Sequence, residues 1–135
     1  MATIKSYTDI EQSRKLAKIL PLESADMEYL AIKENGLLIA KIPFVKDDSE
    51  VEDSAYSHIY DRIVCWSLAT LRNLLPPAIK PNKDLYLFES HNTFNNSWVY
   101  RYYNEDDTSY LYYNNTSEID VCYEMILKLH ELNLL

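Results

Sequence analysis

The chain has 135 residues, of which 47% are apolar and 25% charged, so one domain with a real core is expected and wholesale disorder is excluded. Its 13 basic and 21 acidic residues give a formal charge of −8, which repels phosphate backbones and anionic membrane surfaces. Neither nucleic acid nor a membrane is therefore expected as a partner. Gly36 is the single glycine, where average usage predicts about nine, and this excludes glycine-rich phosphate loops.

The sequence predicts a cytoplasmic protein. It has no basic segment followed by an apolar stretch at its start, and no apolar run approaches the ~18–20 residues needed to span a bilayer. Cys65 and Cys122 lie far apart in apolar surroundings, whereas small secreted scaffolds carry more cysteines at closer spacing. We therefore expect buried free thiols.

Residues 9–20 are predicted to form the first helix. Thr8 and Glu11 stand at the spacing of a capping box, in which each side chain accepts a backbone hydrogen bond that the helix start leaves unmade. Pro21 ends the helix, because the residue before a proline is disfavoured in the helical conformation. The expected buried stripe consists of apolar side chains on one side of the helix: Ile10, Leu16, Ala17 and Leu20.

A hairpin and an acidic loop are predicted next. Two β-prone runs, 28–33 and 37–43, are separated by Asn35-Gly36, a strong hairpin signal because both residues tolerate positive φ. Residues 44–57 are predicted to form an acidic surface loop within the domain. Its centre, Asp47–Asp53, carries five acids and too little apolar area to offset the entropy of ordering it.

The rest of the chain is predicted to form a helix, a meander and a last helix. Residues 57–75 are helix-like, most securely 67–75, where leucines recur at helical spacing before Pro76-Pro77. Three runs then alternate with strand period and predict an antiparallel meander: 84–89, 97–103 and 108–113. The last helix covers about 118–133 and is capped by Thr116 or Ser117.

These elements predict one α+β domain over residues 1–135. Their order is α-β-β-α-β-β-β-α, and an antiparallel sheet, built from the hairpin and the three-stranded meander, packs against about three helices.

Several blocks of the sequence resemble a known family. The blocks are Ser6–Ser13, Leu20–Met27, Cys65–Ala69, Leu74–Pro76 and Glu124–Leu132. They are similar to a family of short uncharacterised proteins found in gut Bacteroidales genomes and their mobile elements. The shared blocks are helix caps and core stripes, so the resemblance implies a common fold and a bacterial or phage cytosol, and it implies no activity.

His58, Asp61 and Cys65 are the candidates for catalysis. On the predicted helix their spacing puts imidazole, carboxylate and thiol on one face, which is the component list of a thiol nucleophile site. The same spacing arises from an exposed His–Asp pair beside a buried cysteine, and no oxyanion element accompanies the trio. Cysteines and histidines stand singly, without the close pair that zinc sites use. We expect no enzyme, no metal and no cofactor.

The most informative feature is the aromatic content of the predicted meander, which holds seven of the twelve tyrosines. Aromatic residues on both sides of these strands exceed what one buried face needs. The surplus is either a recognition surface or a set of cross-strand pairs that stabilise an exposed sheet. The candidate contact residues are Trp98, Tyr100, Tyr102, Tyr110 and Tyr112.

These observations favour a non-enzymatic protein-interaction module that uses an aromatic sheet surface. The partner is another protein or a second copy of the chain. Stacking of bases on the aromatics is disfavoured, because residues 84–116 contain five acids and one base. Two alternatives stay open: a small Cys/His-dependent hydrolase or transferase, and an acidic DNA-mimic inhibitor.

Overall fold

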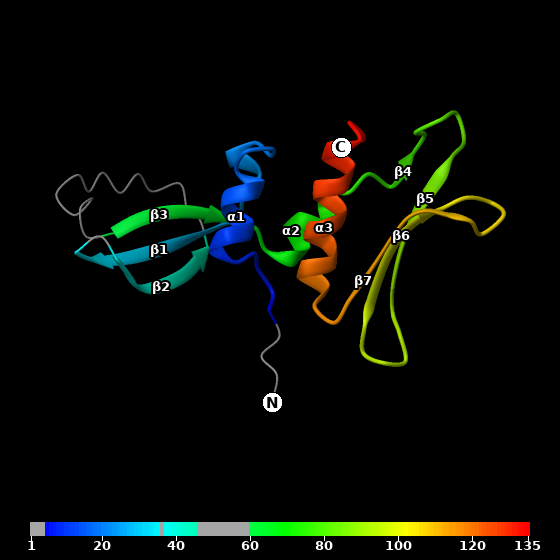
Figure 1. Ribbon diagram of the computed structural model, residues 1–135. Coiled ribbons are helices and arrows are strands. Elements are labelled where there is room, and N and C mark those ends of the chain that lie inside the picture. Colours follow the sequence, from blue (N-terminus) through cyan, green and yellow to red (C-terminus); the bar gives the residue numbers. More distant parts are fainter. Residues whose placement is uncertain (1–4, 36, 46–59) are drawn as a thin grey trace. The chain divides into compact units, whose positions relative to one another are not determined.

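The computed structural model describes residues 5–35, 37–45 and 60–135 (Figure 1). Their three helices and two antiparallel sheets confirm the α+β class. The chain forms two compact units. Residues 9–67 contribute the first, here called the hairpin unit, and residues 68–135, with the described residues before Asp9, form the second, the meander unit.

The hairpin unit contains one helix, one 3₁₀ turn and a three-stranded sheet of order β2-β1-β3. In chain order these elements are α1 (Ile10–Leu16), η1 (Leu22–Ser24), β1 (Met27–Glu34), β2 (Leu37–Val45) and β3 (Tyr60–Cys65). The predicted hairpin is confirmed, because Glu34 pairs with Leu37 across the Asn35-Gly36 loop. Asn35 has a φ of 53°, a left-handed conformation that asparagine tolerates better than most residues.

Helix α1 and its N-cap each begin one residue later than predicted. Asp9 is the N-cap: the Gln12 amide donates to Asp9 Oδ1 at 2.7 Å, and the Asp9 amide donates to Gln12 Oε1 at 3.1 Å. The prediction of Thr8 and Glu11 was wrong because both pairs satisfy the same spacing. The helix ends at Leu16, before the predicted end at residue 20. Of the predicted stripe, Ile10, Leu16 and Leu20 are buried and Ala17 is half-buried.

The prediction of a helix from residue 57 was wrong for residues 60–65. This segment is strand β3, whose Cys65 pairs with Met27 and whose Tyr60 pairs with Ile32 on β1. Pairing with β3 fills the second edge of β1. Ile63 and Val64 of β3 are β-branched residues, which favour a strand. Helix α2 (Leu68–Asn73) confirms the securely predicted part.

The predicted acidic loop, 44–57, begins too early. Phe44 and Val45 belong to β2, where Phe44 pairs with Glu28 on β1. The rest of that prediction, residues 46–57, lies outside the described residues.

The meander unit contains a four-stranded antiparallel sheet of order β4-β5-β6-β7. Its elements after α2 are β4 (Ala78–Ile79), β5 (Tyr86–Asn92), β6 (Trp98–Tyr103), β7 (Ser109–Asn115) and α3 (Glu118–Glu131). The predicted meander corresponds to the last three of these strands. The predicted order lacks β3 and β4. Strand β3 forms by pairing with β1, which is distant along the chain, and β4 is only two residues long.

Asparagine and aspartate supply turn conformations in a chain with one glycine. Asn96 and Asp107, in the connections that flank β6, have φ values of 56° and 60°. Their short polar side chains make the left-handed region less costly than it is for other non-glycine residues. Tight reversals of the meander are therefore formed without glycine.

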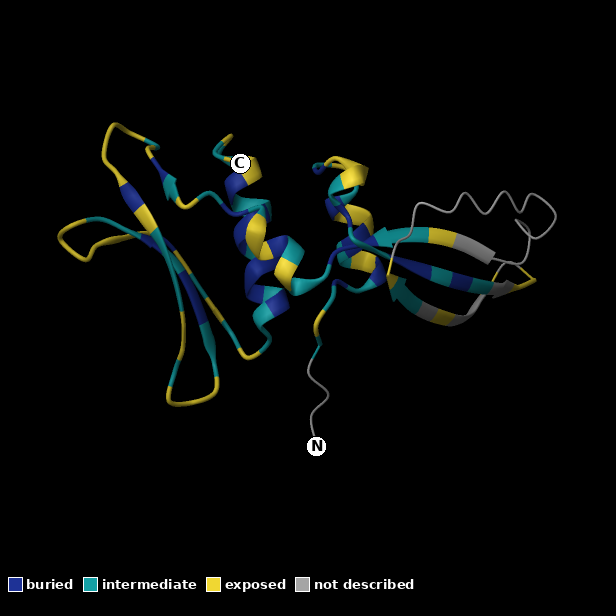
Figure 2. Ribbon diagram, turned by 180° about the vertical axis from the view of Figure 1, so that it is seen from behind, coloured by how far each residue is buried: buried dark blue, intermediate teal, exposed yellow. Residues whose placement is uncertain are grey.

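Helix α3 supplies about half of the meander unit's buried apolar residues. Ser117 is its N-cap and accepts from the Asp120 amide at 3.4 Å, which confirms one of the two predicted caps. The helix contacts β6, β7 and α2, and Figure 2 shows buried residues along it. Its fully buried apolar side chains are Ile119, Val121, Cys122, Met125, Ile126 and Leu129. No helix in the described part of the chain is long and apolar enough to cross a membrane.

Candidate interaction surface

Strand alternation divides the four-stranded sheet into two faces. Tyr100 and Tyr102 of β6 point to the side that α3 covers, which we call the inner face. Arg101 and Tyr103 point to the opposite side, the outer face. The strand register places Glu89 of β5 and Tyr112 of β7 beside Arg101, so these residues share the outer face.

The inner face is a packed core. Tyr100 and Tyr102 are both 0% exposed, and the Phe88 ring lies 5.3 and 5.4 Å from their ring centres. Each phenol still has a hydrogen-bond acceptor: Tyr100 donates to Glu118 Oε2 at 2.5 Å, and Tyr102 donates to the Pro76 carbonyl at 2.7 Å. Burial raises the pKa of both phenols above its ordinary value, so both stay neutral donors.

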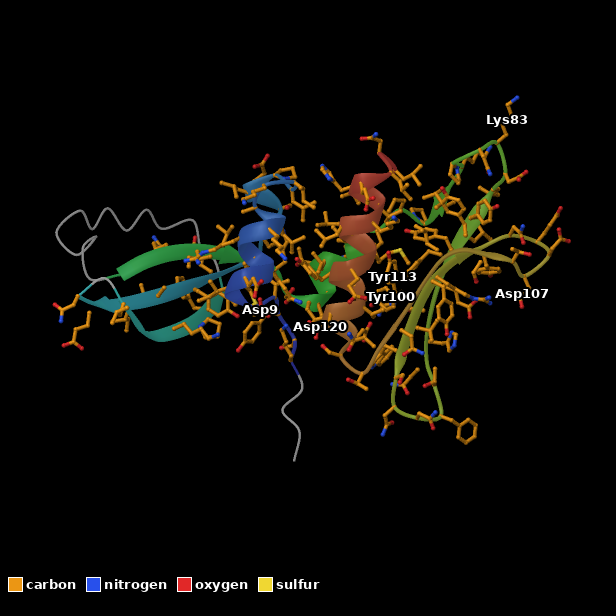
Figure 3. All side chains as sticks on the ribbon, viewed as in Figure 1. Asp9, Lys83, Tyr100, Asp107, Tyr113 and Asp120 are labelled. Carbon is orange, nitrogen blue, oxygen red and sulfur yellow. The ribbon has the colours of Figure 1, made fainter. Side chains whose placement is uncertain are left out.

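Charged groups complete the polar edge of this core. Arg72 of α2 lies 3.5 Å from Glu118 Oε2, 2.9 Å from the Ser90 hydroxyl and over the Tyr100 ring. Glu118 is therefore a nearly buried carboxylate with two donors, which is the condition for keeping an acid beside an apolar core. Figure 3 shows Tyr100 and Tyr113 near α3.

Two of the five predicted contact residues are buried. Tyr100 and Tyr102 cannot form a contact surface because both are fully buried, and Trp98 lies on the same inner face, half-buried. Tyr110 falls at a β-bulge opposite Tyr103, and its ring stacks 5.2 Å from Tyr86, which is itself buried. Tyr110 is still 37% exposed, and Tyr112 is 54% exposed on the outer face.

Arg101 organises the centre of the outer face. Its guanidinium lies 2.9 Å from Glu89 Oε2, 2.8 Å from Asp107 Oδ1 and 4.6 Å from the centre of the Tyr103 ring. The hydrogen bond to Glu89, more than the one to Asp107, raises the pKa of Arg101 above its already high ordinary value. This charge is thus neutralised within the face. Figure 3 labels Asp107 in the turn that follows β6.

Apolar residues remain exposed around this polar centre. Leu85 and Leu87 are 49% and 45% exposed. They border a hollow of about 360 Å³ at one end of the outer face. The hollow is lined by Asp84, Leu85, Leu87, Tyr103, Asn104, Glu105 and Asp106. Its lining therefore combines two leucines and a tyrosine with three acidic residues.

The hollow was not predicted from the sequence, although two signals that bear on the outer face were present. Leu85 and Leu87 alternate with Tyr86 and Phe88, so one of these two pairs had to face away from the core. Arg101, the sole base of residues 84–116, was a second signal, because a lone base among five acids is expected to pair with one of them. Neither signal says which face α3 covers.

The helix that was predicted to align the catalytic trio is not formed at residues 60–65, which are strand β3. Cys65 ends strand β3, Asp61 lies in the same strand with a side chain outside the described set, and His58 is outside the described residues. Cys65 is a fully buried free thiol, and burial, with the nearby carboxylates of Asp26 and Glu28, raises its pKa to about 12. A thiol in this state is protonated at neutral pH and is a poor nucleophile.

Cys122 is the second thiol and confirms the prediction of buried free cysteines. Burial and the neighbouring Glu118 raise its pKa to about 12. Among the residues that the structure describes, no group of three or more histidine, cysteine or acidic side chains is placed to hold a metal ion.

Comparison with protein-family models, with curated proteins and with solved structures finds no match for this chain. The resemblance to the Bacteroidales family stays a prediction.

Proposed function

We propose that this protein is a non-enzymatic interaction module that binds a protein partner through the outer face of the four-stranded sheet. The observation that carries the proposal is the exposure of Leu85, Leu87 and Tyr112 on that face. A sheet with one face buried under a helix has no need of apolar residues on its other face. Apolar and tyrosine side chains beside a hollow are features of protein contact surfaces.

The polar centre of the face also suits a contact surface. Arg101 is held by Glu89, Asp107 and Tyr103, so its position is fixed before any partner arrives. A side chain that is already ordered loses little conformational entropy on binding. The two thiols, by contrast, are buried and protonated, which favours a binding role over thiol chemistry.

Selection from a displayed library of random peptides tests the proposal and does not require a named partner. The test variant is Leu87→Ser with Tyr112→Ser, which removes two exposed apolar groups and leaves the inner face intact. The control is Leu37→Ser with Phe94→Ser, because Leu37 and Phe94 are as exposed or more so and neither belongs to the outer face.

Peptides that bind the wild type are expected to bind the control variant with equal affinity. Their affinity for the test variant is expected to be lost. Hydrogen exchange with a bound peptide should then show protection of backbone amides in residues 84–92 and 101–112. Peptides that bind the test variant as tightly as the wild type, or protection confined to the hairpin unit, would contradict the proposed surface.

A further inference from the structure

We infer that the partner docks a lysine or arginine side chain into the hollow at the end of the outer face, with apolar neighbours against Leu87 and Tyr112. This inference rests on the proposed function and specifies the chemistry of the partner. Its basis is the charge around the hollow, which is separate from the apolar exposure that supports the surface itself.

Within the described residues, no ion pair neutralises the carboxylates of the hollow. Asp84 precedes β5, and Glu105 and Asp106 lie in the turn between β6 and β7, so two separate segments bring three acids to one hollow. Within residues 5–35, 37–45 and 60–135, none of the three has an ion-pair partner at 4.0 Å or less. Asp107, the next acid of the same turn, is by contrast neutralised by an ion pair with Arg101 at 2.8 Å.

The two described bases that are nearest to the hollow's residues along the chain, Lys83 and Arg101, do not fill this role. Arg101 is already shared between Glu89 and Asp107. Lys83 is exposed in the loop before β5 and does not line the hollow. In a chain of net charge −8, an excess of negative charge at an apolar hollow attracts a cation and repels an anion.

The shape and the lining select a long cationic side chain over a free ion. Leu85, Leu87 and Tyr103 form an apolar floor that can contact the methylene stem of lysine or arginine, while the charged end reaches the carboxylates. A hollow of about 360 Å³ accepts one such side chain with part of its backbone. Flanking apolar residues of the same segment then reach Leu87 and Tyr112, both about half exposed.

Fluorescence anisotropy with three labelled synthetic peptides tests the inference. The peptides alternate leucine with lysine, with glutamate or with glutamine, and are otherwise identical. The test variant is Asp84→Asn with Asp106→Asn. The control is Glu23→Gln with Glu34→Gln, which makes the same change in net charge at two exposed positions of the hairpin unit.

The lysine peptide is expected to bind the wild type more tightly than the other two. Its affinity should fall about three- to tenfold in the test variant, stay within about twofold in the control, and weaken between about 50 and about 300 mM salt. Equal affinity for the three peptides, or an equal loss in test variant and control, would overturn the inference.

The outer-face variant, Leu87→Ser with Tyr112→Ser, separates the two proposals. If library-selected peptides lose affinity for this variant but contain no enrichment of lysine or arginine, the surface is right and the basic partner is wrong. If the lysine peptide binds this variant as tightly as the wild type, binding does not use the outer face, and both proposals fail.

Discussion

The two faces of strand β6 place tyrosines in opposite environments within a few residues. Tyr100 and Tyr102 are fully buried against α3, with each hydroxyl donating to a fixed acceptor. Tyr103 is half-buried under Arg101, and Tyr112 on the neighbouring strand is 54% exposed. The comparison teaches that the tyrosine surplus has two causes. One set is core, whose hydroxyl groups are satisfied internally, and the other lies on the side of the sheet opposite α3.

The largest loss of stability is expected when an aromatic ring of the inner face is removed. Tyr102→Ala deletes a fully buried aromatic side chain and leaves the Pro76 carbonyl without its donor. The free energy of unfolding should fall by about 3–5 kcal/mol, as measured by urea denaturation. Tyr102→Phe keeps the ring and should cost about 1 kcal/mol. A loss below about 1 kcal/mol for the alanine variant would show that this face is not core.

Alkaline pH should destabilise the packing of α3 against the inner face, because Cys122 of α3 is a buried thiol. The pKa of Cys122 is about 12 in the fold and 9.0 ordinarily, so its contribution is complete below pH 9 and is lost as the pH rises toward 12. Each such thiol lowers the free energy of unfolding by up to about 1.4 kcal/mol per pH unit in this window. Cys122→Ala should remove one such slope, leaving that of Cys65 and, above about pH 10, those of the buried phenols of Tyr100 and Tyr102. Urea midpoints measured from about pH 8 to about pH 11 that have the same slope in variant and wild type would contradict this.

Removing a single inner hydroxyl should have a smaller effect. Tyr100→Phe takes from Glu118 its donor at 2.5 Å, while Arg72 stays 3.5 Å away. Hydrogen bonds to charged groups contribute about 1.5–3 kcal/mol, so a loss in that range is expected in urea denaturation. Tyr112→Phe on the outer face is the matched control and should change stability by less than about 0.5 kcal/mol. Equal costs for the two variants would remove the distinction between the faces.

The smallest effect is expected on the outer face. Tyr112→Ser removes a ring that is 54% exposed, so the free energy of unfolding should change by less than about 0.5 kcal/mol. The same variant should weaken binding of peptides selected on the wild type. A loss of several kcal/mol would mean that Tyr112 belongs to the core and would undermine the proposed surface.

Short-range sequence patterns predicted the elements that such a pattern by itself can specify. Asn35-Gly36 predicted the hairpin, the leucine spacing predicted α2, and Ser117 with the apolar stripe that follows it predicted α3. Strands β3 and β4 were missed because their evidence is a partner strand. The register of β3 against β1 joins residues about thirty positions apart, and no local pattern records it.

The candidate surface, too, could be predicted from the sequence only in part. Period-two alternation in the sequence determined that Tyr100 and Tyr102 share one face and that Arg101 and Tyr103 share the other. Only the tertiary structure decided which face is buried, because that choice depends on where α3 packs. The physical reason is that a strand's pattern is symmetric between its two faces, and burial against a helix breaks the symmetry. The composition established an acidic chain rich in tyrosine, and the fold decided which acids and which tyrosines stay exposed.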